Sequence, residues 1–264
     1  MRELSAILLM LCCPAFAFPQ QATVKAGYAV VTPLTPGRFT VTETFGLKIA
    51  SDSMQAGTLA ADLTTNATLF VNVSDRLGRN SGVALINPWT QDARITLTIR
   101  REDGVSLGSK TIFVPARSQT SQLITGLFSD LQSFPRELAG MMTVKSTMPV
   151  GILALRFRGP IFSTEPITRL DQAISLPVLL PGVGGSGALV FPQFAVGGGW
   201  ATEFVIANLD TTILRFRIDI FAQDGSPMAV SLNGKTANTF FDLLVFPGGV
   251  LTVAPRDANG DTQF

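Results

Sequence analysis

Two short stretches decide the fold. Residues 94–100 read RITLTIR, and residues 214–220 read LRFRIDI. In both, apolar and polar side chains alternate with a period of two, as they do in a strand with one buried and one solvated face. A helix would place its apolar residues three and four positions apart. The alternation therefore predicts antiparallel β structure at both places.

The two stretches are matched parts of an internal repeat. Residues 69–107 lie over residues 190–228 at a constant offset of 121, with no gap. Alternation alone does not explain the match, because it includes polar and turn residues: Asn87 with Asn208, and Asp103-Gly104 with Asp224-Gly225. Pro115 then corresponds to Pro247 at an offset of 132, which predicts an insertion of 11 residues in the second copy around residues 231–241. The sequence therefore predicts two related units.

A fainter correspondence involves the N-terminal region. Residues 26–46 match residues 139–159 at an offset of 113, sharing Ala-Gly, Val, Pro and Gly at the same spacing. The closing strands expected in the first unit, 141–145 and 151–158, have no counterpart after the second unit, because Phe264 aligns with Gln132. We hypothesise that an N-terminal hairpin at 26–46 either completes the second unit across the chain, or begins the first unit while the second awaits strands from a neighbour or a longer chain.

The start of the chain predicts export. A short charged start precedes an apolar run over residues 4–13, and Ala15 and Ala17 occupy the positions that a signal peptidase reads. We expect residues 1–17 to be a signal peptide, which would remove both cysteines, Cys12 and Cys13. No later apolar stretch approaches the roughly 20 residues of a membrane-spanning helix. The predicted location is therefore secreted or cell-surface.

These observations predict an organisation of five segments. They are a signal peptide at 1–17, an N-terminal hairpin and connecting segment at 18–65, a first β-sandwich unit at 66–170, a Pro/Gly linker at 171–187, and a second unit at 188–264 that lacks its last two strands. Short strands with turns every eight to twelve residues are typical of antiparallel, immunoglobulin-like sandwiches. The fold class is therefore all-β, with tandem sandwiches of this architecture.

Three finer expectations follow from local patterns. The Asp-Gly pairs predict type I′ hairpin turns, which require positive φ at both central residues. Residues 121–131 predict one short helix, capped by Ser121, because apolar residues recur there at spacings of three and four. The register predicts that a set of apolar residues is buried while Arg156, Arg158 and Arg217 face water: Ile95, Leu97, Ile99, Leu153, Leu155, Phe157, Phe216, Ile218 and Ile220.

Two phrases carry a resemblance to known proteins. GVALINP at residues 82–88 and PVGILALRFRG at residues 149–159, together with the signal peptide and the order of the units, resemble uncharacterised secreted bacterial proteins built of tandem immunoglobulin-like sandwich repeats. The resemblance covers nearly all of the chain after residue 17. Its motifs are structural, so it implies architecture and export but no catalytic residue.

Composition excludes several classes of function. The chain has no histidine, which rules out Ser-His-Asp triads, Cys-His pairs and histidine-ligated zinc or haem. A net charge of +1 gives no field to hold nucleic acid. We expect no cofactor and no metal. Residues 257–261 place oxygens at alternate positions as a calcium loop does, but Thr262 stands where such a loop needs glycine, so a turn is predicted.

Two tryptophans are the candidate ligand-binding residues. Trp89 and Trp200 lie in predicted loops at strand ends, where an exposed indole can stack on a sugar ring, although folding back over the core is the simpler interpretation. Carboxylate pairs for glycoside hydrolysis need no histidine, and the candidates are Glu102, Asp103, Asp219, Asp224 and Asp242. Rows of arginine at Arg156 and Arg158, and at Arg215 and Arg217, are expected to be solvated edge charges that could also bind acidic glycans.

The sequence favours a non-enzymatic function. We expect a secreted structural or adhesive surface module whose partner is an unknown protein or glycan at the cell surface. A carbohydrate-binding module is the alternative, and a glycoside hydrolase with a carboxylate pair is a more remote one.

Overall fold

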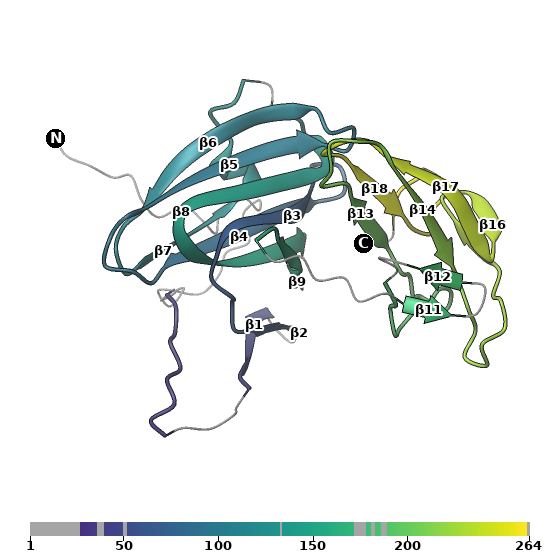
Figure 1. Cartoon of the computed structure of the whole chain (residues 1–264), viewed down its shortest axis with the longest axis horizontal. Helices are drawn as coiled ribbons and strands as arrows, with labels where there is room; N and C mark the ends of the chain where they lie inside the picture. Colours follow the sequence, from purple (N-terminus) through teal and green to yellow (C-terminus); the bar gives the residue numbers. More distant parts are fainter. Residues whose placement is uncertain are drawn as a thin grey trace.

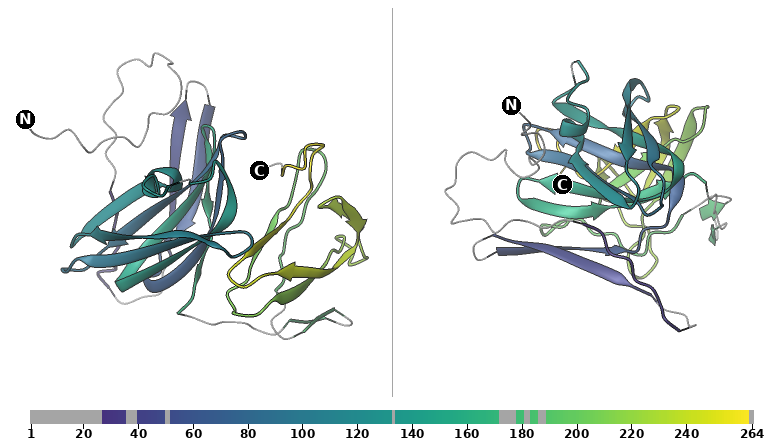
Figure 2. Two further views of the ribbon diagram at one scale, coloured as in Figure 1. Left: turned by 90° about the horizontal axis from the view of Figure 1, so that it is seen from above. Right: turned by 90° about the vertical axis from the view of Figure 1, so that its left-hand side faces the viewer.

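The computed structural model describes residues 27–35, 40–49, 52–132, 134–171, 178–180, 183–185 and 189–262. The predicted signal peptide lies outside the described residues. Over these residues the chain is all-β, with antiparallel strand pairs and one short helix, α1 (Ile124–Leu127), as the sequence predicts. We call residues 64–170 the first unit and residues 189–262 the second unit; they lie side by side in Figures 1 and 2.

The first unit is organised around one long strand. β8 (Glu137–Arg158) has 22 residues; its first half pairs with β3 and β5, and its second half pairs with β4 and β9. It therefore belongs to two layers, β10-β3-β8-β5-β6 and β7-β4-β8-β9 (Figure 1). The other strands are β3 (Thr64–Ser74), β4 (Arg79–Asn87), β5 (Ala93–Arg101), β6 (Ser106–Val114), β7 (Ser118–Leu123), β9 (Ile161–Glu165) and β10 (Ile167–Arg169).

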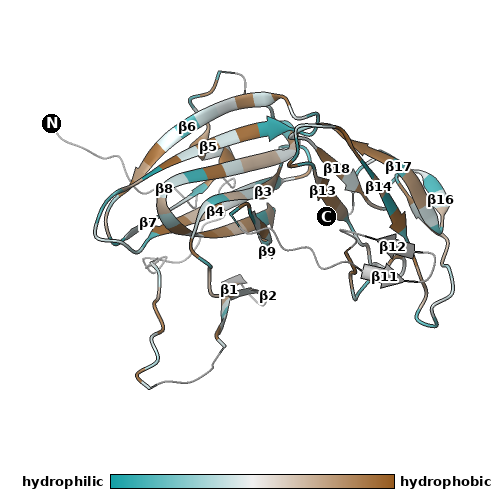
Figure 3. Cartoon of the chain, viewed as in Figure 1, coloured by the Kyte–Doolittle hydropathy of each residue, from teal (hydrophilic) through white to brown (hydrophobic). Residues whose placement is uncertain are grey.

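The hydrophobic core of the first unit lies between these layers. Leu69 of β3, Leu85 of β4 and Leu97 of β5 belong to one cluster of buried apolar side chains. Ile95 and Ile99 are fully buried as well, which confirms the predicted period of two in β5. Figure 3 shows the same interleaving of hydrophobic and hydrophilic residues along the strands. A sandwich-like arrangement with one shared core follows.

The predicted register is wrong in the second half of β8. Ile152 and Ala154 are the residues buried in the core, whereas Leu153, Leu155 and Phe157 are half-buried on the other face. That other face is only partly exposed to water, because a hairpin packs on it. β1 (Thr42–Ile49) and β2 (Asp52–Leu59) pair with each other, and Phe45 stacks on Phe162 of β9 with ring centroids 5.6 Å apart. Phe157 packs beside Phe162 in turn, at 6.3 Å. With apolar cover on both faces, alternation no longer identifies the inner one.

The helix is shorter than predicted and is capped differently. Ser121 belongs to β7, and the residue before the helix is Leu123, which makes no side-chain capping bond. Ile124, Leu127 and Phe128 are buried in the core of the first unit. The apolar spacing thus identified the buried face of the helix. Ser121 does not cap the helix, because it belongs to β7 and pairs with β4.

The second unit pairs its strands only two by two. β13 (Phe204–Ala207) pairs with β18 (Val250–Val253), β14 (Leu214–Asp219) with β17 (Thr239–Val245), and β15 (Val230–Leu232) with β16 (Lys235–Ala237). The β15–β16 hairpin lies in the predicted insertion. Val114 opposes Ala93, and Val245 opposes Leu214, so the offset beyond the insertion is 131 and the insertion has 10 residues rather than 11. Arg117 and Gly248, both with left-handed φ, are the matched turn residues in place of the prolines.

Matched positions of the two units make the same hydrogen bonds. The Gly104 amide donates to the Arg101 carbonyl at 2.9 Å, and the Gly225 amide donates to the Ala222 carbonyl at 3.0 Å. Only the glycine of each Asp-Gly pair has positive φ, so these are type I turns closed by a left-handed glycine, not the predicted type I′ turns. The turn at Gly197–Trp200 has positive φ at both central glycines instead.

A buried asparagine ties each unit together in the same way. Asn87 and Asn208 are fully buried at the ends of β4 and β13. The Asn87 amide donates to the carbonyls of Gln91 at 2.7 Å and Val114 at 3.0 Å, and that of Asn208 to the carbonyls of Thr212 at 2.7 Å and Val245 at 2.8 Å. The side-chain oxygen of each asparagine accepts a hydrogen bond from the backbone amide two residues later in the chain. In each unit, the repeated Asn therefore satisfies a buried carbonyl at the end of one strand and a carbonyl of the following loop.

The N-terminal hairpin is displaced from its predicted position. Residues 27–35 form no strand, and the hairpin begins at Thr42 and extends to Leu59. Within the predicted linker, β11 (Val178–Leu180) pairs with β12 (Val183–Gly185).

Replacing Asn87 by alanine is expected to destabilise the first unit by about 2 kcal/mol, because it leaves buried carbonyls without donors. Asn208→Ala should act in the second unit through the same contacts. Urea denaturation followed by fluorescence measures both, with the exposed Asn259→Ala as the control. Equal stability of Asn87→Ala and Asn259→Ala would contradict a structural role for the buried amide.

Candidate functional site

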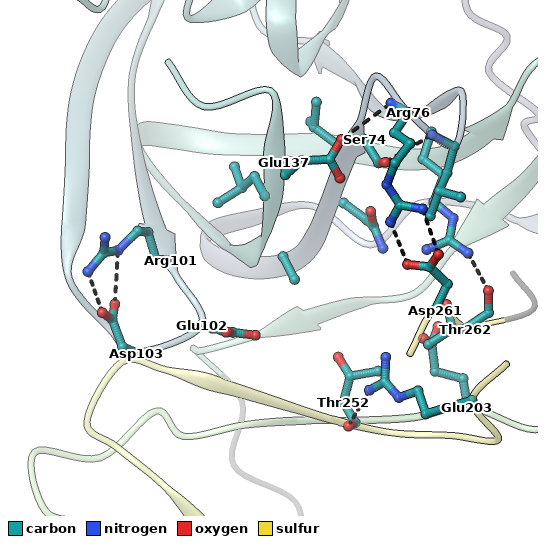
Figure 4. Close-up of a pocket in the computed structure, with 17 residues that line it drawn as sticks. Ser74, Arg76, Arg101, Glu102, Asp103, Glu137, Glu203, Thr252, Asp261 and Thr262 are labelled. Atoms are coloured by element: carbon teal, nitrogen blue, oxygen red, sulfur yellow. Dashed lines mark hydrogen bonds and ion pairs between the residues drawn. The ribbon is translucent and has the colours of Figure 1, made fainter. Parts of the chain in front are cut away.

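A cleft of about 500 Å³ lies between the two units (Figure 4). The first unit contributes the β3–β4 turn and the β5–β6 turn, and the second unit contributes the end of β18 and the C-terminal turn. Four arginines and five carboxylates line it: Arg76, Arg79, Arg101, Arg256, Glu102, Asp103, Glu137, Glu203 and Asp261. Charged side chains of both units thus come together in this cleft.

A bidentate ion pair crosses the cleft. Arg76 donates from both terminal nitrogens to the Asp261 carboxylate, at 2.7 and 2.6 Å (Figure 4). Asp261 is held in place by a turn in which its amide donates to the Asp257 carboxylate at 2.9 Å. The hydrogen bond from Arg76 lowers the pKa of Asp261 below its usual value. Paired N–H donors on one carboxylate fix direction as well as distance.

A second arginine reaches the C-terminal segment from a buried position. Arg79, at the start of β4, donates to the backbone carbonyl of Thr262 at 2.6 Å. Its Nε has no hydrogen-bond partner in the described structure. Burial is the main cause that lowers the pKa of Arg79, and the nearby charges of Arg158 and Arg156 lower it further. Arg79 is therefore a costly group to bury, which a contact across the junction partly offsets.

A third arginine links β8 to the second unit. Arg156 donates to Glu203 at 2.8 Å, lies 3.8 Å from Glu165, and sits over the Phe70 ring at 5.3 Å. Burial raises the pKa of Glu165, against the opposing effect of Arg156. The predicted solvated row of Arg156 and Arg158 is therefore wrong for Arg156, because the second unit covers that arginine.

Apolar and backbone contacts complete the junction. Phe70 of β3, Met141 of β8 and Val250 of β18 form one buried cluster. The Val250 amide donates to the Glu102 carbonyl at 2.9 Å. Gly104 combines a φ of +84° with a backbone approach so close that a Cβ would stand 2.1 Å from the Pro247 carbonyl oxygen. Only glycine fits there, for turn geometry and for packing against the second unit.

The predicted ligand-binding tryptophans do not line this cleft. Trp89 is 40% exposed, and its indole nitrogen donates to the Pro149 carbonyl at 2.6 Å. Trp200 is 70% exposed and ends the tight turn that begins at Gly197. The indole of Trp89 is thus partly committed to its own unit, whereas Trp200 presents most of its surface to solvent.

Two of the five candidate carboxylates, Glu102 and Asp103, lie in the cleft; Asp219, Asp224 and Asp242 do not line it. Asp103 pairs with Arg101, and that hydrogen bond lowers its pKa. Asp219 pairs with Arg217, and Asp242 with Arg215 at 3.5 Å. In the part of the chain that the structure describes, no cluster of three or more acidic, His or Cys side chains could hold a metal ion.

Sequence reasoning missed the residues that matter most at the junction. Arg76, Arg79 and Glu203 were not singled out, because Arg76 and its partner Asp261 are 185 positions apart and nothing local distinguishes the arginine. The Asp257–Asp261 turn was recognised, but not the partner of its last carboxylate. The cleft brings together opposite charges from the two units, and we call the Arg76–Asp261 ion pair the clamp.

Comparisons with known proteins give little. No protein-family model matches the chain, and no curated protein gave a significant match. Among solved structures, the Anabaena sensory rhodopsin transducer matches 35% of this chain and 95% of its own, at 20% identity and a TM-score of 0.29. That score is too low to carry an argument about fold or function. Among the described residues, no helix is long and apolar enough to cross a membrane.

The contribution of Asp261 to stability is expected to depend on pH. Because its folded pKa is depressed, the ion pair stabilises the protein above the unfolded value of about 3.9, and this stabilisation is lost as the pH falls through the folded pKa. Wild type should therefore exceed Asp261→Asn in unfolding midpoint at pH 7, and the difference should vanish in stronger acid. Denaturation from pH 7 to pH 2.5 measures it.

Asp242→Asn is the control, since it removes a carboxylate of the same kind at an exposed pair outside the junction. If Asp261→Asn and Asp242→Asn behaved alike at every pH, the clamp would contribute nothing measurable.

Proposed function

We propose that this chain is a secreted, non-enzymatic structural or adhesive module of the cell surface, built from tandem immunoglobulin-like units. The observation that carries the proposal is the junction. Units joined by a flexible linker move independently by default, and a large buried interface removes that freedom. Here an apolar cluster, a backbone hydrogen bond and three arginine contacts hold the units together. A stiff module transmits force between its ends, which structural and adhesive proteins must do.

The sequence supports the same proposal from another side. The apolar start with small residues before position 18 fits export, and the absence of histidine removes the commonest acid–base catalyst. The charged groups of the cleft bind mainly one another, so few are free for a substrate. The partner would be a protein or glycan at the cell surface.

The test is made on cells. Cells that export the full chain should retain it on their surface, and should attach to a substratum or to one another severalfold better than cells without it. Arg76→Asp should reduce attachment by loosening the junction, and Arg76→Asp combined with Asp261→Arg should restore it. A protein that stays inside the cell, or attachment unaffected by its loss, would overturn the proposal.

Carbohydrate binding is a second candidate, favoured by the exposure of Trp200. A flat indole held on a turn can stack on the apolar face of a sugar. In the same experiment, a glycan array probed with the exported chain separates the candidates. Binding that is lost in Trp200→Ala and kept in Trp200→Phe would favour a carbohydrate-binding module, and turnover of a glycan that is lost in Glu102→Gln would favour a hydrolase.

A further inference from the structure

The second unit has two strand edges whose counterparts in the first unit are paired. β4 pairs with β7 and β8, and β5 pairs with β6 and β8. Their counterparts at the offset of 121 are β13 and β14, which within the described residues pair only with β18 and β17. Both missing partners correspond to the same strand, β8. Within the described residues, the second unit thus has no strand that matches β8.

The core of the second unit is less buried than that of the first at matched positions, although Phe191 and Phe194 pack on Phe204. Five residues that are buried in the first unit have half-buried counterparts: Val83 with Phe204, Leu85 with Ile206, Ala93 with Leu214, Ile95 with Phe216, and Leu97 with Ile218. The difference has one direction at every pair. Strand edges that are unpaired within the described residues are ready sites for an added strand.

The segment that matches β3 in the second unit also lacks strand structure. β3 pairs along its length with β8, and Leu69 in it is 2% exposed. Residues 190–194, expected to form the matching strand, are irregular, and Val190 at the position of Leu69 is 61% exposed. Leu189 and Phe191 beside it are exposed too. Without β8, this segment has no strand to pair with.

The N-terminal segment has the pattern of the missing strand. At the offset of 113, residues 27–41 correspond to residues 140–154 of β8. The core-facing Met142, Val144, Ile152 and Ala154 become Ala29, Val31, Phe39 and Val41, all apolar. In the folded chain residues 27–35 form no strand and are exposed, with Val30 at 73% and Val31 at 61%. One chain thus contains an apolar segment that forms no strand and two strands, β13 and β14, that each have a free edge within the described residues.

The pairing of the first unit fixes the register of the docked segment. Leu97 opposes Val144, and Val83 opposes Ala154. Transferring both offsets places Val31 opposite Ile218 on β14, and Val41 opposite Phe204 on β13. Thr32 would lie opposite Arg217, with both side chains on the outer face, as Lys145 and Thr96 do.

The placement of the segment in the folded chain favours a second copy as its source. Gly27 and Tyr28 lie against residues 117–121, at the β7 edge of the outer layer. β1, which follows the segment, is held on β9 at the opposite edge of that layer by Phe45 and Phe162. Gly27 and β1 therefore lie at opposite edges of this layer of the first unit, while the second unit packs on the β3 and β8 face (Figures 1 and 2).

We propose that residues 27–41 of one copy pair with the free edges of β13 and β14 of a second copy, in the place that β8 takes between β4 and β5. Each copy then gives one strand and receives one, at two different surfaces. A head-to-tail contact of this kind does not close on itself unless its rotation happens to form a ring, so it builds chains of molecules. Assembly goes beyond the proposed surface role and does not depend on any ligand.

The test is a cysteine cross-link in the full chain, with Cys12 and Cys13 replaced by serine. Thr32→Cys with Arg217→Cys should give a ladder of covalent oligomers on oxidation, since directly opposed residues have Cβ atoms about 5 Å apart. Each single cysteine is the control and should give no species beyond a dimer. A cross-linked monomer would mean that residues 27–41 pair with β14 of the same chain. The absence of any cross-link would mean that this segment does not pair with β14 at all. Either result overturns the proposal.

A second measurement does not depend on cysteine chemistry. Sedimentation velocity of the wild type should show oligomers that grow with concentration. Val31→Asn, whose side chain would face the core, should stay monomeric, whereas its neighbour Val30→Asn, facing outward, should assemble like wild type. Both positions are exposed in the folded chain, so neither change threatens folding. A wild type that is monomeric at every concentration, or equal behaviour of the two variants, would contradict the inference. Because purified protein suffices, this outcome is independent of the attachment test.

Discussion

A strand shared by two layers is the constraint on which the rest of this structure depends. β8 pairs with β3 and β5 along its first half and with β4 and β9 along its second, so one segment supplies hydrogen bonds to both sheets and covers the core between them. Where β8 is present, β5 buries every second side chain. In the described part of the second unit, where no counterpart of β8 is present, Phe216 and Ile218 of β14 are half-buried and the matched strand edges have no partner.

The same strand holds the two units together. Met141 packs against Val250, and Arg156 reaches Glu203 from the second half of the strand. Burying charge is expensive, and a buried ion pair contributes more to the choice of one arrangement than to its stability. At the junction this argument applies to Arg156 with Glu203, whose side chain is only 5% exposed: the apolar cluster drives association of the units, and this ion pair selects one orientation.

Much of the fold follows from the sequence, because alternation and matched turns are local signals. The burial of Ile95, Leu97 and Ile99 needed only a period of two, and the equivalence of Asn87 and Asn208 needed only a constant offset. The register of β8 failed because its second face is covered by the β1–β2 hairpin, which no local pattern announces. The junction was out of reach for a related reason, since Arg76 and Asp261 meet only after both units have folded. Trp200 was correctly placed at a strand end, but its exposure depends on the tertiary fold.

The central claim, that the second unit lacks a strand which a second copy can supply, is tested most directly by amide hydrogen exchange at two protein concentrations. At low concentration, every amide of β5 should exchange slowly, whereas alternate amides of β14, those at its free edge, should exchange fast. At high concentration the free-edge amides and those of residues 27–35 should become protected together. Slow exchange along all of β14 at low concentration, or a free edge that stays fast while the protein oligomerises, would contradict the account.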